Sequence, residues 1–150
     1  MSVEDEVRRA SDQYYVALGH LLNGDAGPII EAWSHSPDVT AMNPYGGREV
    51  GWEQLRPVFE QVAQLCRGSQ VTLGRRNSLI QVGGDLAYET AIEFGQGTIA
   101  GKPTSIEHRV TNIYRREAGG WKIVHRHTDL NPAERDVPSQ LQSAQEQANS

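Results

Sequence analysis

Cysteine, long apolar runs and a surplus of either charge are all scarce in this chain of 150 residues. Its one cysteine, Cys66, excludes an internal disulfide and the common zinc-binding patterns. No apolar run approaches the ~20 residues that a membrane-spanning helix needs, so we expect no membrane partner. The charged start MSVEDEVRRA lacks the apolar region of a secretory signal. We therefore expect a cytoplasmic protein.

The net charge is only −5, and acidic and basic residues are well mixed along the chain. This balance argues against nucleic acid and against an anionic membrane surface as partners. The length and the ordinary apolar fraction favour a single domain with a real core. We expect this domain at residues 1–131. Residues 132–150 are polar and rich in Gln and Ser, which predicts a flexible or loosely helical tail.

Apolar residues at three- and four-residue spacings predict helices in the first half of the chain. The first covers residues 3–22 and stops at Asn23-Gly24. A short second helix follows at 25–33. A third is expected at 51–67, although Pro57 lacks the N–H that a helix interior needs, so the helix either bends there or has a separate first turn.

From residue 69 onward the hydrophobic period changes to that of strands. Glycine-containing turns divide the second half into four long strands, at about 70–82, 86–99, 104–117 and 121–130. Short strands are also expected at 39–43 and 48–50. Helices followed by an antiparallel meander predict an α+β fold, in which the three helices cover the concave face of a curved sheet.

The final predicted strand carries the most distinctive polar pattern. Because side chains alternate along a strand, one face is expected to hold Trp121, Ile123, His125, His127 and Asp129. This face begins apolar and ends in two imidazoles and a carboxylate. It is typical either of a pocket floor with a polar mouth or of a strand that leaves the core for water.

His127 is the leading acid/base candidate in this pattern, followed by His125, because an imidazole can donate and accept protons near neutral pH. Asp129 is a candidate to orient the ring. The alternatives are a hydrogen-bonded core histidine or one exposed at a dimer face. The His-x-His pair lacks a clear third ligand, so we expect neither a metal nor another cofactor.

Arg109 shares its predicted face with Glu107, Thr111 and Ile113 on the neighbouring strand. If that face is concave, the guanidinium needs a partner, which Asp129, Glu107 or a ligand oxygen would provide. The alternative is an ion pair that only ties the sheet together. Thr111 is a candidate contact for the same ligand.

Aromatic residues supply the other candidate ligand contacts. For any single aromatic, core packing is the simpler explanation, but together they are typical of an apolar small-molecule pocket with a few polar groups. The candidates are Tyr14, Trp33, Tyr45, Phe59 and Tyr88.

The order of elements, with a last strand reading Gly-Gly-Trp-Lys-Ile-Val-His-Arg-His over residues 119–127, resembles the nuclear transport factor 2-like superfamily. It is most similar to the SnoaL-like and ketosteroid-isomerase-like branch. The last two strands also resemble the association (hub) domain of calcium/calmodulin-dependent protein kinase II, through Arg115-Arg116, a turn, and the Gly-x-Trp-x-x-Val-His-x-His pattern.

The resemblance implies a cone-shaped sheet around helices, a pocket at the wide end, and a homodimer through the outer sheet face. It places Asn43 where ketosteroid isomerases have their aspartate base. An amide cannot abstract a proton from carbon, so Asn43 is at most a ligand contact.

Two functions follow as expectations. The first is a cofactor-independent isomerase, cyclase or dehydratase for a small apolar carbonyl compound, in which a histidine moves the proton and Arg109 or a tyrosine stabilises the oxyanion. The second is a non-catalytic module that binds a carboxylate ligand or serves in assembly, because one fold can host many functions.

Overall fold

The computed structural model describes residues 1–44 and 46–130, in which three helices pack against one curved sheet. The helices are α1 (Val3–Leu22), α2 (Gly27–Ala32) and α3 (Trp52–Leu65). The strands are β1 (Thr40–Asn43), β2 (Gly46–Val50), β3 (Gln70–Gly83), β4 (Leu86–Ile99), β5 (Lys102–Glu117) and β6 (Gly120–Leu130). The predicted α+β class is thereby confirmed.

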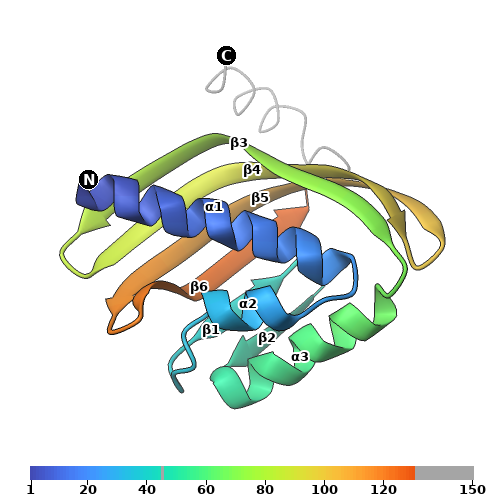
Figure 1. The fold of residues 1–150 in the computed structure, drawn as a ribbon, viewed down its shortest axis with the longest axis horizontal. Coiled ribbons are helices and arrows are strands. Elements are labelled where there is room, and N and C mark those ends of the chain that lie inside the picture. The colour runs from blue at the N-terminus through green and yellow to red at the C-terminus, as the bar shows by residue number, and fades with distance from the viewer. Residues whose placement is uncertain (45, 131–150) are drawn as a thin grey trace, which may run out of the picture.

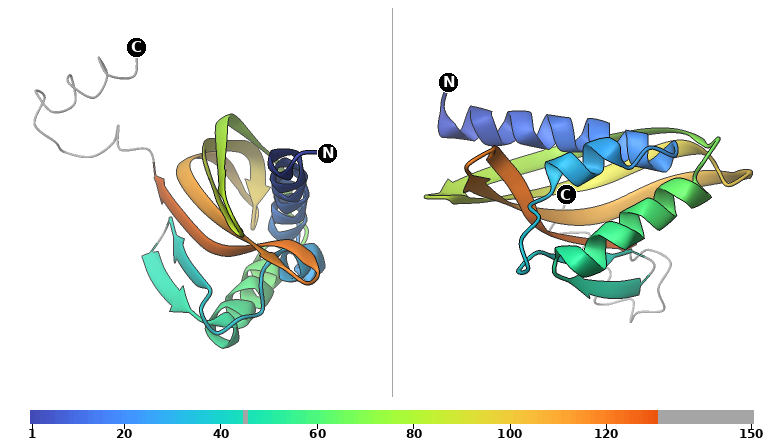
Figure 2. Two further views of the ribbon diagram at one scale, coloured as in Figure 1. Left: turned by 90° about the vertical axis from the view of Figure 1, so that its left-hand side faces the viewer. Right: turned by 60° about the horizontal axis from the view of Figure 1, so that its bottom comes forward.

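The strands form a single open sheet in the order β2-β1-β6-β5-β4-β3. Pairing is antiparallel along β3, β4, β5 and β6, as the meander predicted, and the β1–β2 hairpin is antiparallel too. The pair β1–β6 is parallel, which sequence patterning did not anticipate. Figure 2 shows that the three helices lie on the same, concave side of the curved sheet.

Helix α1 crosses this concave face (Figure 1). Its N-terminus is capped by Ser2, which forms a reciprocal capping box with Asp5 that satisfies two backbone N–H groups. Its buried stripe of Val7, Tyr14, Leu18 and Leu21 packs into the main core. Helix α3 continues through Pro57 as one element, so the separate first turn that we considered does not form.

None of the described helices is both long and apolar enough to cross a membrane. The predicted tail at 132–150 lies outside the described residues, and so does Tyr45.

Candidate functional site

A β-bulge in β6 decides which of its side chains enter the fold. Ile113 pairs with His125 and Tyr114 pairs with Ile123, so Val124 is an extra residue between two regular pairs. Ile123 and Val124 are both buried in the core. After the bulge the alternation is shifted by one residue. The five residues predicted to share one face are therefore divided between the two faces of the sheet.

The outer face holds His125, His127 and Asp129, whereas Arg126 and Thr128 point inward. His125 accepts or donates a hydrogen bond with the Thr40 hydroxyl at 2.7 Å. Burial, together with the neighbouring His127, lowers the pKa of His125.

Arg109 also lies on the outer face, because β5 turns its other face toward the helices. With Thr111, His127 and Asp129 it lines a shallow surface hollow. The Arg109 guanidinium is 3.9 Å from one Asp129 oxygen, and His127 Nε2 is 3.4 Å from the other. The structure thus brings these four predicted residues together, but on the convex surface rather than inside the cone.

The concave face carries a different set of polar residues, which the sequence reasoning missed. On β5 the inward side chains are Ile106, His108, Val110, Asn112 and Tyr114. On β4 they include Glu89 and Glu93, which are 0% and 1% exposed. The signal that identifies the inward face of β5 is its larger apolar content. The inward face carries Ile106, Val110 and Tyr114, whereas the outer face has Ile113 alone.

Glu93 is fixed by groups from three other elements. Arg126 donates through both terminal nitrogens, with Nη2 at 2.8 Å, and Tyr15 of α1 donates at 2.8 Å. His108 Nδ1 lies 3.7 Å from the other carboxylate oxygen. Burial alone would raise the pKa of Glu93, but Arg126, the adjacent His108 and the hydrogen bond from Tyr15 outweigh it and lower the pKa to about 2.

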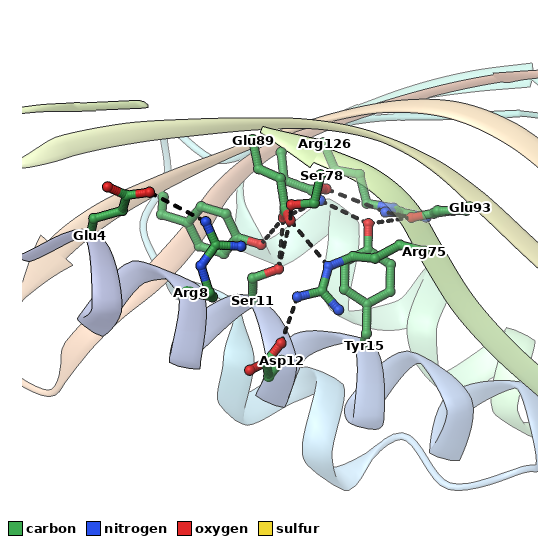
Figure 3. A network of polar contacts seen from close by, with 12 residues as sticks. Glu4, Arg8, Ser11, Asp12, Tyr15, Arg75, Ser78, Glu89, Glu93 and Arg126 are labelled. Carbon is green, nitrogen blue, oxygen red and sulfur yellow. Dashed lines mark hydrogen bonds and ion pairs between the residues drawn. The ribbon is translucent and has the colours of Figure 1, made fainter. Parts of the chain in front are cut away.

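Glu89 is the centre of a second group of contacts, one turn nearer the start of α1 (Figure 3). Its carboxylate accepts hydrogen bonds from three hydroxyls, one guanidinium and one amide. The donors are Ser11 at 2.7 Å, Ser78 at 2.5 Å, Tyr114 at 2.9 Å, Arg75 at 3.1 Å and Asn112 at 3.3 Å. Burial raises the pKa of Glu89, but these donors produce a net lowering. Arg75 also bonds Asp12 on α1.

Asn112 joins the two groups, because it donates to the Tyr15 hydroxyl and accepts from Arg126. Both carboxylates are therefore held ionised by several donors, and a carboxylate with a low pKa is a weak proton acceptor. Among the inward-facing groups of this network, His108 carries an imidazole, in which one nitrogen can accept a proton while the other donates.

The remaining predicted ligand contacts fall in several places. Tyr14, Trp33 and Phe59 are in the buried core, with the Trp33 and Phe59 ring centroids 5.8 Å apart. Burial raises the pKa of Tyr14 to about 12. The indole N–H of Trp33 is buried and has no hydrogen-bond partner among the described residues. Tyr88 is 45% exposed on the outer face.

Asn43 lies in β1 and donates to a Glu49 oxygen at 3.0 Å, so its amide supports the β1–β2 hairpin. Within the described residues, no group of three or more histidine, cysteine or acidic side chains is arranged to hold a metal ion.

Comparison with known structures shows the same fold in proteins of different named functions. A candidate dehydratase of the NTF2-like family from Streptomyces avermitilis is 18% identical, with 85% of this chain and 95% of that chain covered and a TM-score of 0.73. The CaMKII hub of S. rosetta is 20% identical, with 87% and 98% covered and a TM-score of 0.68. A candidate ketosteroid isomerase from Shewanella frigidimarina is 21% identical, with 83% and 94% covered and a TM-score of 0.65.

These identities show a common fold and carry no activity with them. No curated protein matches the chain. The family model of the SnoaL-like domain matches residues 7–129, a span that includes every residue of the buried network. The chain belongs to the SnoaL-like domain family, within the NTF2-like superfamily.

Proposed function

We propose that this protein binds a small carbonyl compound on the concave face of its sheet and acts on it as a cofactor-independent isomerase or lyase. The observation that carries the proposal is the position of His108, a buried imidazole on β5 that adjoins the Glu93–Arg126 ion pair. The residue types are those that the sequence predicted for this chemistry, a histidine and an arginine, but they are different residues.

In this mechanism His108 takes a proton from the carbon next to the carbonyl and returns it at another position. Glu93 orients and balances the imidazolium, as a carboxylate beside a catalytic histidine does. Arg126 makes three hydrogen bonds to described side chains with its five N–H donors, so it has donors left for the oxyanion.

The surroundings of His108 support an apolar ligand. Its neighbours on the same face of β5, Ile106 and Val110, are buried, as is Ala91 on β4. These three residues lie outside the contiguous cluster that forms the main hydrophobic core. Apolar side chains with a few polar groups among them are the usual composition of a small-molecule site.

The test is deuterium exchange, which detects proton transfer before the substrate is known. Cyclic and β,γ-unsaturated ketones are incubated with the protein in D₂O, and NMR follows the loss of the proton at carbon. We expect His108→Asn to reduce the exchange rate by roughly 100-fold or more, the usual contribution of general acid–base catalysis. The matched variant His127→Asn, on the outer face, should keep the wild-type rate.

Loss of activity in His127→Asn or Arg109→Ala with full activity in His108→Asn would reject this assignment. The catalytic roles first predicted for His127, His125, Arg109 and Asp129 would then apply at the outer hollow. Those roles stay predictions that the same assay decides. A cytoplasmic location likewise stays a prediction.

Assembly is the second candidate function, and the outer face of the sheet favours it. Large apolar side chains are exposed there, including Leu79 at 53%, Tyr88 at 45% and Phe94 at 41%. Such a surface on a small domain is typical of a protein contact. We propose a homodimer through this face. One of the similar structures is a hub by name.

Analytical ultracentrifugation tests this assignment. Tyr88→Glu and Phe94→Glu should each shift the protein toward monomer, whereas Val16→Glu, at a position that is 63% exposed on α1, should leave its mass unchanged. A monomeric wild-type protein, or one insensitive to both outer-face variants, would reject the dimer.

A further inference from the structure

Arg126 of β6 already holds an internal carboxylate. Both of its terminal nitrogens contact Glu93, one on each carboxylate oxygen. This two-point pairing is the geometry that arginine otherwise uses to bind the carboxylate of a ligand. Glu93 is 1% exposed, whereas Arg126 keeps 12% and His108 keeps 8% of its side-chain surface accessible.

We infer that Glu93 is a specificity-determining residue of the proposed site. It occupies the Arg126 guanidinium as a built-in carboxylate and restricts the site to ligands that carry no carboxylate of their own. The inference rests on the proposed ligand site and narrows the ligand class to neutral carbonyl compounds. It also argues against the binding of a ligand carboxylate by Arg126.

The charges around the site support this restriction. Glu93 and Glu89 are balanced by Arg126 and Arg75, so the interior network has no unpaired cation among these four residues. A ligand carboxylate would have to lie near Glu93 or displace it. Displacement would leave Glu93 buried and unpaired, which is costly in a region of low dielectric constant.

A neutral carbonyl oxygen meets neither difficulty. It can accept one of the remaining Arg126 N–H groups while the pair with Glu93 stays intact. The Tyr15 hydroxyl further fixes Glu93, because it donates to the carboxylate and accepts from Asn112. The position of Glu93 is therefore determined from β5, β6 and α1 as well as from its own strand.

Removing the carboxylate of Glu93 should make the site prefer a ligand that carries a carboxylate over a neutral one. The Glu93→Ala variant leaves a space beside Arg126 that propionate can fill, whereas propionamide has nearly the same shape without the charge. Thermal unfolding is measured with each probe for the wild type, Glu93→Ala and the double variant Glu93→Ala/Arg126→Met, with ionic strength matched by NaCl.

We expect propionate to raise the Tm of Glu93→Ala by at least about 3 °C more than propionamide does, since a ligand that binds only the folded state stabilises it. The wild type and the double variant should show no such preference. If Glu93→Ala is unfolded alone, far-UV circular dichroism should show that propionate, and not propionamide, restores its folding.

The inference is overturned if propionate fails to favour Glu93→Ala, or if it stabilises the wild type through Arg126. Neither readout depends on turnover, so a failure here leaves the deuterium-exchange test of His108 intact. Conversely, a protein without catalytic activity would still show the change in selectivity.

Discussion

The two faces of the sheet each carry a trio of one arginine, one carboxylate and one histidine, and the trios differ mainly in burial. Inside the cone, Arg126, Glu93 and His108 are 12%, 1% and 8% exposed at the side chain. Outside it, Arg109, Asp129 and His127 are 59%, 44% and 41% exposed. Arg126 Nη2 lies 2.8 Å from a carboxylate oxygen of Glu93, whereas Arg109 Nη2 lies 3.9 Å from a carboxylate oxygen of Asp129.

This difference shows that residue type alone does not identify a site. Water screens the outer charges, so their mutual attraction is weak and each remains free to meet another molecule. The inner charges are desolvated, so each requires its partner and the geometry becomes fixed. A fixed geometry is what proton transfer needs, whereas an adaptable surface suits contact with a second protein.

The largest expected contrast is in stability. Arg126→Met leaves Glu93 buried without its main partner, and removal of one member of a buried pair typically costs about 3–5 kcal/mol. Arg109→Met removes only a long, exposed contact and should change the free energy of unfolding by less than about 0.5 kcal/mol. Urea unfolding followed by circular dichroism measures both values.

The double variant Glu93→Gln/Arg126→Met is the control for this contrast. It removes both charges together, so it should recover much of the stability that Arg126→Met loses. If the double variant lost as much free energy of unfolding as the two single variants together, the two residues would act independently. If Arg126→Met and Arg109→Met lost equal amounts, the two faces would not differ in this respect.

The fold was largely predictable from the sequence because local signals agree with one another. The apolar stripe of α1, the glycine turns and the strand lengths each pointed to helices followed by a meander, and the sheet follows that order. The parallel pairing of β1 with β6 was not predictable in this way, because it depends on how β1 returns to the sheet after α2.

The site was not predictable to the same degree, and the reason lies in two residue positions. Val124 adds one residue to β6, and no pattern in Trp121–Asp129 marks it as a bulge, so strict alternation assigned His125 and His127 to the wrong side relative to Ile123. On β5 the apolar residues Val110 and Tyr114 indicate the inward face. The prediction chose the opposite face because Arg109, a possible oxyanion donor, lies there.

Acid should lower the free energy of unfolding, because it protonates Glu93, the carboxylate of the inner trio. The folded-state pKa of Glu93 is about 2, below its ordinary value of 4.5. The ionised group therefore contributes stability that is present above pH 4.5 and lost as the pH falls through about 2. The free energy of unfolding, measured by urea titration between pH 6 and the lowest pH at which the protein stays soluble, should decline steeply below about pH 4.5.

In Glu93→Gln this part of the decline should disappear, because glutamine does not titrate. The variant is also less stable at neutral pH, so the comparison concerns the slope against pH and not the absolute value. An unchanged slope in Glu93→Gln would instead assign the acid sensitivity to Glu89 or to other carboxylates.

The smallest expected effect concerns the two histidines of the outer face. Burial is the main cause that lowers the pKa of His125, and the nearby His127 lowers it further, while the contact with Thr40 acts in the opposite direction. Replacing His127 by Gln removes a like charge, so the pKa of His125, followed by NMR of its ring protons, should move upward toward its ordinary value of 6.5 without reaching it, because burial remains. An unchanged pKa of His125 in this variant would contradict the expectation and would leave burial as the cause of the lowered pKa.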